Sequence, residues 1–195
     1  MARLILARHG ETDWNSERRW QGHADRPLNE VGRAQARELA GRLAGREIAA
    51  VYSSDLLRAR ETAEIVAERL ALTVSVDAGL REVDVGEWSG LSLAEAEERF
   101  PEGFRRWREG LHGWEHGESY EAMRRRVVMA VLAIAARHPG QTVLVVGHGG
   151  SIRACGAEAA GVDYASSRAA GIGSTANCGV VELRVTEGRL AAATD

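Results

Sequence analysis

The most strand-like stretch of the chain is Thr142-Val143-Leu144-Val145-Val146-Gly147-His148-Gly149-Gly150, an apolar run that ends abruptly in glycines and a histidine. An uninterrupted apolar run of this length is typical of a central parallel strand, which is buried on both of its faces. The glycines end the strand, and a helix is expected to start at Ser151. A second run, Leu4-Ile5-Leu6-Ala7, ends in the same way at Arg8-His9-Gly10. Both stretches predict a buried strand that leads into a polar loop.

Strand and helix patterns alternate along the rest of the chain. Further strands are expected at residues 48–52 and 73–76, closing edge strands at 179–185 and 190–193, and helices at 27–44, 56–70, 92–100 and 119–137. This alternation predicts an α/β fold, a three-layer αβα sandwich with a mostly parallel central sheet. The length of 195 residues fits one domain, so residues 1–195 are expected to form a single unit.

The composition is that of a soluble globular protein, with 45% apolar and 27% charged residues. The formal net charge is −3, and all 25 basic residues are arginines, so no net positive field is available for a nucleic acid or a membrane surface. Two cysteines, Cys155 and Cys178, cannot make a disulfide framework or a cysteine-rich zinc site. The N-terminal apolar run is too short for a signal peptide or a membrane span, which predicts a cytoplasmic protein.

Polar residues follow the predicted strands, at the edge of the sheet where ligands bind in such folds. Arg8 and His9 follow the first strand, Arg58 the second, Glu82 the third and His148 the central one. Arginines can hold an oxyanion by paired hydrogen bonds, and a histidine can act as a nucleophile or proton carrier near neutral pH. This set suits phosphoryl transfer, because the cations neutralise the transferred group, an imidazole attacks it and the carboxylic acid protonates the departing oxygen.

Four blocks of sequence around these residues resemble the histidine phosphatase superfamily, in its phosphoglycerate-mutase-like branch and in the small phosphatase type. In chain order they are Arg8-His9-Gly10-Glu11-Thr12 with Gln21-Gly22 downstream, Tyr52-Ser53-Ser54 through Arg58-Ala59-Arg60-Glu61-Thr62-Ala63, Leu80-Arg81-Glu82 through Gly86-Glu87-Trp88-Ser89-Gly90, and Val146-Gly147-His148-Gly149-Gly150. All four blocks occur in the order of the family, which makes the resemblance specific.

The resemblance implies a role for each of these residues. His9 is the nucleophile that becomes phosphorylated, and Arg8, Arg58 and His148 form the phosphate pocket. Glu82 is the general acid and then the base that activates water. Substrate-binding roles fall to Asn15, Gln21, Gly22 and Gly149. No metal or other cofactor is expected, because arginines and imidazoles supply the positive charge.

The stretch after Glu82 favours a phosphatase over a mutase. Mutases of this branch resemble a pattern with tyrosine and lysine at the positions that Val85 and Leu93 occupy here, where those groups are expected to hold phosphoglycerate. We therefore predict a phosphomonoesterase that hydrolyses small soluble phosphate esters through a phosphohistidine at His9, with a small phosphorylated metabolite as its partner. Two alternatives stay open: a 2,3-bisphosphoglycerate-dependent phosphoglycerate mutase, and a non-catalytic phospho-ligand-binding protein.

An insertion around residues 84–117 is expected to cover the active site, and its tryptophans are expected to pack in the core or lid. Candidates for the mouth of the cleft are His23, Trp107, Trp114 and His116. The spacing of His112 and His116 does not predict a zinc site, because the glycines around them disfavour a helix.

The run Arg124-Arg125-Arg126 is expected on the solvated side of a helix rather than in an anion-binding patch. A homodimer is the common default for such a protein.

Overall fold

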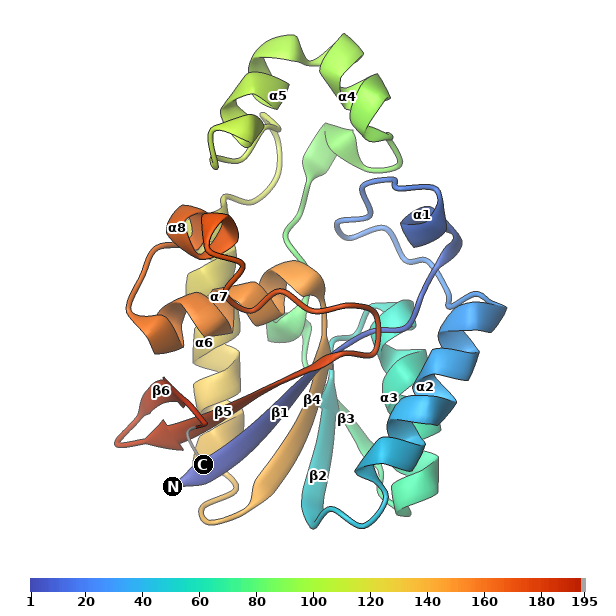
Figure 1. Cartoon of the computed structure of the whole chain (residues 1–195), viewed down its shortest axis with the longest axis vertical. Helices are drawn as coiled ribbons and strands as arrows, with labels where there is room; N and C mark the ends of the chain where they lie inside the picture. Colours follow the sequence, from blue (N-terminus) through green and yellow to red (C-terminus); the bar gives the residue numbers. More distant parts are fainter. Residues whose placement is uncertain (194–195) are drawn as a thin grey trace.

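Six strands form one mixed sheet in the order β3-β2-β4-β1-β5-β6 (Figure 1). The structure is a computed structural model that describes residues 1–193. The strands are β1 (Ala2–Arg8), β2 (Ile48–Ser53), β3 (Val74–Val76), β4 (Thr142–Gly147), β5 (Val180–Thr186) and β6 (Arg189–Ala192). The first four run parallel around β4, whereas β5 pairs antiparallel with β1 and β6 antiparallel with β5. Of the two strands expected to close the sheet, β6 is therefore the edge strand.

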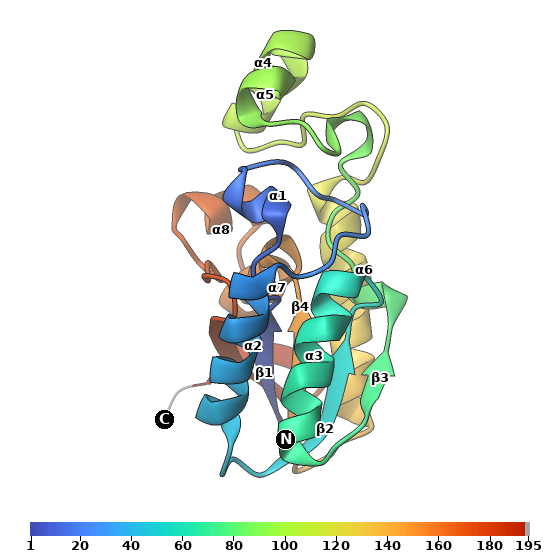
Figure 2. The same cartoon turned by 90° about the vertical axis from the view of Figure 1, so that its right-hand side faces the viewer.

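Helices cover both faces of the sheet, which confirms the predicted three-layer sandwich with a mostly parallel sheet. The helices α2 (Glu30–Leu43) and α3 (Leu57–Leu70) lie on one face, and α6 (Tyr120–Ala136) and α7 (Gly149–Ala160) lie on the other (Figure 2). Successive side chains of β1 point to opposite faces. Leu4 and Leu6 pack in the core on the α6 and α7 side, and Ile5 and Ala7 in the core on the α2 and α3 side.

Capping residues in the loops determine where the helices begin. The side chain of Asn29 accepts the N–H of Gly32 at the start of α2, and the side chain of Ser119 accepts the N–H of Ala122 at the start of α6. The first N–H of α3 is capped from a distance, because Leu57 donates to the carboxylate of Asp25 at 2.6 Å. This contact ties the loop around residues 17–29 to α3.

Four shorter helices lie outside the two helix layers: α1 (Asp13–Ser16), α4 (Leu93–Arg99), α5 (Pro101–Arg108) and α8 (Tyr164–Ala169). Only α4 is expected from the sequence, as the helix at residues 92–100. Two 3-10 turns, η1 (Ala78–Leu80) and η2 (Gly86–Trp88), connect β3 to α4. Within residues 1–193, no helix is both long and apolar enough to cross a membrane.

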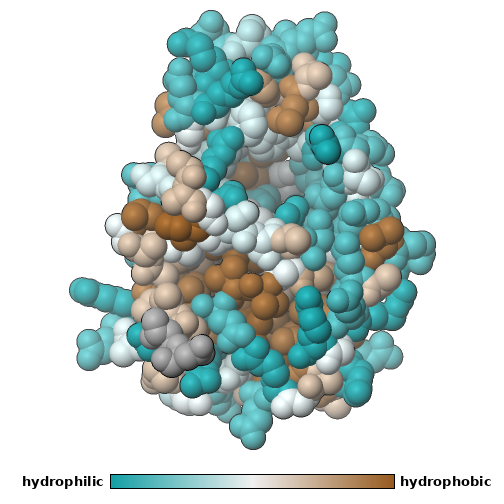
Figure 3. All heavy atoms as spheres, in the orientation of Figure 1, coloured by the Kyte–Doolittle hydropathy of each residue, from teal (hydrophilic) through white to brown (hydrophobic). Residues whose placement is uncertain are grey.

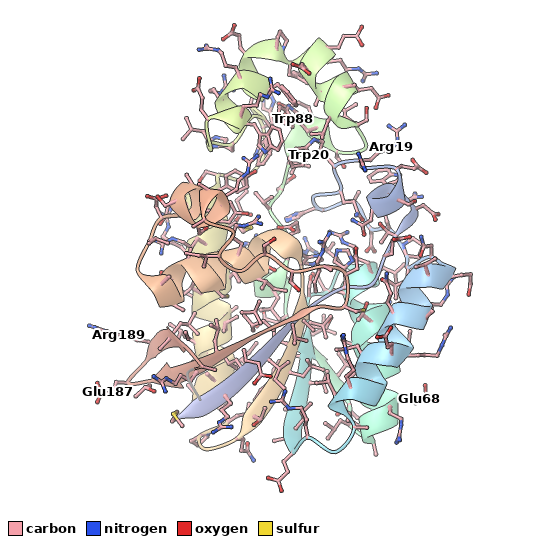
Figure 4. All side chains as sticks on the ribbon, viewed as in Figure 1. Arg19, Trp20, Glu68, Trp88, Glu187 and Arg189 are labelled. Carbon is pink, nitrogen blue, oxygen red and sulfur yellow. The ribbon has the colours of Figure 1, made fainter. Side chains whose placement is uncertain are left out.

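The segment 86–117, which we call the cap, projects beyond the carboxyl ends of the parallel strands (Figure 1). Its base is an aromatic cluster in which Trp88 and Trp114 are fully buried, so their packing role is confirmed. Trp20, from the loop after α1, contacts Trp88 edge-on with the ring centroids 5.4 Å apart (Figure 4). The two ends of the cap touch at Gly86, where a Cβ atom would lie 1.4 Å from the carbonyl oxygen of His116.

Candidate active site

A cavity of about 410 Å³ opens at the carboxyl ends of β1 and β4, between the sheet and the cap. Figure 3 shows a hollow between the cap and the body of the molecule, with hydrophilic residues on its rim. Its wall includes Arg8, His9, Arg58 and Glu82, which lie far apart in the sequence. The parallel strands bring them together, since the loops after parallel strands all leave at the same edge.

His9 is the first residue after β1, and its side chain is buried. Its Nδ1 lies 2.7 Å from the carbonyl oxygen of Gly10. A carbonyl only accepts, so this bond requires the proton on Nδ1 and leaves the lone pair on Nε2. Burial, followed by the positive charges of Arg58 and Arg8, lowers the pKa of His9 well below its ordinary value. The ring is therefore neutral at neutral pH, with Nε2 available as a nucleophile.

Arg58 lies in the first turn of α3 and is 1% exposed. Its Nη1 and Nη2 donate to the carbonyl oxygens of Ala24 and Gly22, both at 2.8 Å. Burial lowers the pKa of Arg58 to about 10, so the guanidinium keeps its charge at neutral pH. Arg8 is held from the other side, because its Nη1 donates to the carbonyl oxygen of Thr175 at 3.0 Å. The Nε atoms of both arginines are buried and have no partner among the described residues.

His148 follows β4, and its side chain is completely buried. Its ring centroid lies 5.3 Å from that of His9, at an interplanar angle of 61°. Burial, followed by the charge of Arg58, lowers the pKa of His148 well below its ordinary value. Neither ring nitrogen has a hydrogen-bond partner within residues 1–193. Buried polar nitrogens are costly unless they are paired, so this cluster is suited to an oxyanion that accepts from several of them.

Glu82 approaches the cavity from the loop after η1. Its Oε2 accepts the N–H of Gly150 in the first turn of α7, and its Oε1 accepts the N–H of Val83, both at 2.9 Å. A Cβ atom on Gly150 would lie 2.2 Å from Oε1, so only glycine permits this approach. The role of Gly150 was not predicted from the sequence, although the Gly149-Gly150 pair is a signal for close contact.

The residues with expected substrate-binding roles also line the cavity: Asn15, Gln21, Gly22 and Gly149. The Oδ1 of Asn15 accepts the N–H of Thr12 at 3.1 Å, which leaves its amide nitrogen as a free donor. Thr12 also donates its hydroxyl to the Oε1 of Gln21 at 3.0 Å.

The four candidates for the mouth of the cleft lie in different places. Trp107 lines the cavity, but Trp114 is buried beneath the cap and the side chain of His116 is almost fully exposed. The Nε2 of His23 is 2.8 Å from the backbone carbonyl oxygen of Glu82, behind the cavity wall. The expectation is therefore met by Trp107 and is wrong for His23, Trp114 and His116, which do not line the cavity.

The cavity is also lined by residues that the sequence did not single out. Arg153, Arg168, Tyr120 and Tyr164 line it, together with Arg18 and Arg19. Arg153 stands four residues after Gly149 in α7, so helical spacing from the glycine was a usable signal for it. Arg19 is paired with Glu17 and Glu95, but Arg18, Arg153 and Arg168 have no carboxylate partner in the described part of the chain. The cavity is thus strongly cationic.

The chain matches the histidine phosphatase superfamily (branch 1) over residues 4–194. It belongs to this family. Phosphoserine phosphatase 1 of Hydrogenobacter thermophilus is 41% identical over 165 residues, which cover 84% of this chain and 78% of the relative. The family prediction is therefore confirmed, and the chain is a histidine phosphatase that acts on small phosphate esters.

Two solved structures are similar over nearly the whole length of the phosphatase. YhfR of Bacillus stearothermophilus superposes with a TM-score of 0.89 at 34% identity, covering 100% of this chain and 96% of that one. A mycobacterial glucosyl-3-phosphoglycerate phosphatase complexed with VO3 has a TM-score of 0.88 at 33% identity, with coverages of 98% and 97%.

Replacing Gly150 with alanine tests how the carboxylate of Glu82 is held. The new Cβ would displace Oε1, so we expect turnover of alkyl phosphates to fall at least about tenfold. Stability should not fall in parallel, since alanine is the better helix former by about 1 kcal/mol. Gly41→Ala in α2 is the matched control, because open space surrounds that position. Unchanged turnover in Gly150→Ala would contradict the contact.

The lowered pKa values of His9 and His148 predict a loss of stability in acid. In the unfolded chain both imidazoles titrate near pH 6.5. Below that pH the unfolded state therefore binds protons at these two side chains, whereas in the folded state they stay neutral. The free energy of unfolding should fall by up to about 1.4 kcal/mol per pH unit for each histidine. Urea unfolding at pH 7 and pH 5.5, without phosphate, should show a smaller loss in His148→Gln than in the wild type. Equal losses would argue against a neutral buried imidazole at position 148.

Proposed function

We propose that the phosphatase hydrolyses phosphate monoesters in two steps through a phosphohistidine on His9. In the first step, the lone pair of Nε2 attacks phosphorus in line, the N–P bond forms and the bond from phosphorus to the ester oxygen breaks. The carboxylic acid of Glu82 gives its proton to the departing oxygen, so the alcohol leaves neutral. The bond from Nδ1 to the carbonyl of Gly10 stabilises the positive charge that the ring acquires.

In the second step, the carboxylate of Glu82 takes a proton from water, and the resulting hydroxide attacks phosphorus. The N–P bond breaks, its electron pair returns to Nε2, and inorganic phosphate leaves. Arg8, Arg58 and His148 donate hydrogen bonds to the equatorial oxygens in both steps, so they stabilise the charge on the transferred group. Asn15 adds a donor from its amide nitrogen, and Gln21, Gly22 and Gly149 shape the wall.

One observation carries this assignment: near the neutral imidazole of His9, the buried Nε atoms of Arg8 and Arg58 and both ring nitrogens of His148 have no hydrogen-bond partner in residues 1–193. A tetrahedral phosphoryl group offers each of them an acceptor. A purely structural cluster of this kind would have its buried nitrogens paired within the protein.

Hydrolysis is favoured over mutase activity by the cavity wall. Val85 and Leu93 line it, at the positions where the resemblance to mutases expects tyrosine and lysine. Both side chains are apolar and cannot bind a second phosphate or carboxylate there. Leu93 and Trp107 belong to the cap, which supports our proposal that the segment around 84–117 covers the active site.

We further propose that the alcohol part of the substrate carries a second anionic group, such as a carboxylate. Arg18, Arg153 and Arg168 line the same cavity without a carboxylate partner in the described chain, and they are additional to the arginines assigned to phosphate. Phosphoserine and glucosyl-3-phosphoglycerate, the substrates in the names of two relatives, both carry a carboxylate.

Brief reaction with labelled substrate tests the mechanism. We expect protein-bound phosphate that is labile in acid and persists in alkali in the wild type, and none in His9→Ala. Glu82→Gln should lose about 100-fold in kcat/KM for an alkyl phosphate but much less for p-nitrophenyl phosphate, because kcat/KM reports the first step and this leaving group needs no proton. Equal losses on both substrates would remove Glu82 from the acid role. Conversion of 3-phosphoglycerate to 2-phosphoglycerate would instead favour the mutase, and phosphate binding without any turnover a non-catalytic protein.

A panel of monoesters tests the second anionic group. Phosphoserine and 3-phosphoglycerate should have higher kcat/KM than 2-glycerol phosphate, which has no carboxylate. Arg153→Gln should raise the KM of the two anionic substrates about tenfold, since a charged hydrogen bond is lost, and leave p-nitrophenyl phosphate nearly unchanged. A uniform effect on all substrates would exclude a carboxylate-binding role for Arg153.

A further inference from the structure

Arg126, in the second turn of α6, does not lie on the solvated side of the helix as the sequence predicted. Its side chain is 27% exposed and that of its partner Glu118 18%, whereas the neighbouring Arg125 is 66% exposed and only approaches Glu121 at 3.7 Å. The expectation holds for Arg125 and is wrong for Arg126, and also for Arg124, whose side chain is 25% exposed and pairs with Glu158 of α7. A partly buried arginine requires partners, and the loop that carries Glu82 supplies most of them.

All five N–H donors of Arg126 are used. The Nη1 group donates to the carbonyl oxygens of Gly79 and Arg81, at 2.9 and 3.1 Å. The Nη2 group donates to the carbonyl oxygen of Glu82 at 3.2 Å and to Glu118 Oε2 at 2.6 Å, and Nε donates to Glu118 Oε1 at 3.0 Å. Three carbonyls of one short loop thus converge on a single planar cation, which fixes their directions.

The bond to Glu82 acts on the peptide unit that orients the carboxylate. The carbonyl oxygen of Glu82 and the N–H of Val83 belong to the same planar peptide group. Arg126 and the ring of His23 hold the oxygen of this group, and its N–H donates to Glu82 Oε1 on the other side. Any rotation of this peptide plane would therefore move the donor that aims the carboxylate.

Glu118 is in turn fixed where the cap rejoins the body. Its backbone N–H donates to the carbonyl oxygen of Asp84 at 2.9 Å, and its own carbonyl oxygen accepts the indole N–H of Trp114 at 2.9 Å. Its carboxylate then orients the guanidinium of Arg126 through two bonds. The position of the cap is thereby transmitted to the loop that carries Glu82.

We propose that Arg126, oriented by Glu118, is the positioning residue for Glu82 in proton transfer to the leaving group. This inference rests on the proposed acid role of Glu82. Arg126 does not line the cavity, so it acts through Glu82 and not on the substrate. The chemical step that needs the proton should therefore depend on Arg126, whereas attack by His9 on an activated ester should not.

The test compares kcat/KM for 2-glycerol phosphate and for p-nitrophenyl phosphate in matched variants. For Arg126→Gln we expect at least a tenfold loss on the alkyl ester and less than a threefold loss on the activated ester. Glu118→Gln should show the same split at smaller size, and Arg126→Lys should recover part of the loss because it keeps the charge. Arg125→Gln, on the same helix, should leave both substrates unchanged.

The double variant Glu82→Gln/Arg126→Gln separates positioning from general damage. If Arg126 acts through Glu82, the double variant is no slower on the alkyl ester than Glu82→Gln alone. The proposal would be overturned if the loss in the double variant equalled the product of the two single losses. Equal losses on both esters would also overturn it. If Arg126→Gln proves unfolded in a thermal melt, Glu118→Gln and Arg126→Lys test the proposal instead. The same comparison applies, a larger loss of kcat/KM on the alkyl ester than on the activated ester.

The same data distinguish the two levels of inference. Absence of the split in Glu82→Gln itself would overturn the acid role on which the proposal rests. A split in Glu82→Gln that is absent from Arg126→Gln and Glu118→Gln would overturn the positioning role alone.

Discussion

The buried charge of Arg58 is the constraint around which the active site is organised. A guanidinium that is 1% exposed must be compensated, and here the carbonyl oxygens of Gly22 and Ala24 do so without neutralising it. The loop that carries these carbonyls is itself tied to α3 by Asp25. The charge therefore stays available to a substrate oxyanion. Burial, followed by this charge, also lowers the pKa of His9 and His148 and keeps both imidazoles neutral.

The neutral imidazoles and the two arginines, which have no carboxylate partner in residues 1–193, both suit the proposed phosphoryl transfer. The lowered pKa of His9 preserves the nucleophilic lone pair, and the bond from Nδ1 to Gly10 places that lone pair on Nε2. In the proposed mechanism the arginines bind the oxygens of the group that is attacked. Their Nε atoms have no partner among the described residues and can donate to such an oxygen.

The carboxylate of Glu82 is positioned by backbone N–H groups that lie close to it rather than by a charged side chain. Gly150 lets the carboxylate reach the first turn of α7, and the peptide unit after Glu82 holds its other oxygen. The cap contributes through Glu118, which joins its returning segment to the loop of the acid. One set of contacts thus links the position of the cap to the position of the Glu82 carboxylate, the acid of the proposed mechanism.

The sequence by itself determined the layers, the parallel strands and the edge at which the polar residues gather. Hydrophobic periodicity is a local property. The ends of the strands near residues 8, 53 and 147 can therefore be predicted from the runs of apolar residues. The motifs around Arg8, His9, Arg58, Glu82 and His148 identified the family for the same reason, since each motif is continuous in the chain.

Only the tertiary structure decided which groups are paired and which stay free. The sequence pattern predicts an ordinary surface arginine at position 126, and only the structure shows its contacts with the loop of residues 79–82. Arg153 lines the cavity because α7 packs beside β1, which the sequence does not show. The short helix α8, of six residues, owes its conformation to packing against α7 rather than to its own periodicity. The physical reason is that pairing and burial depend on contacts between segments distant in sequence, on which local patterns carry no information.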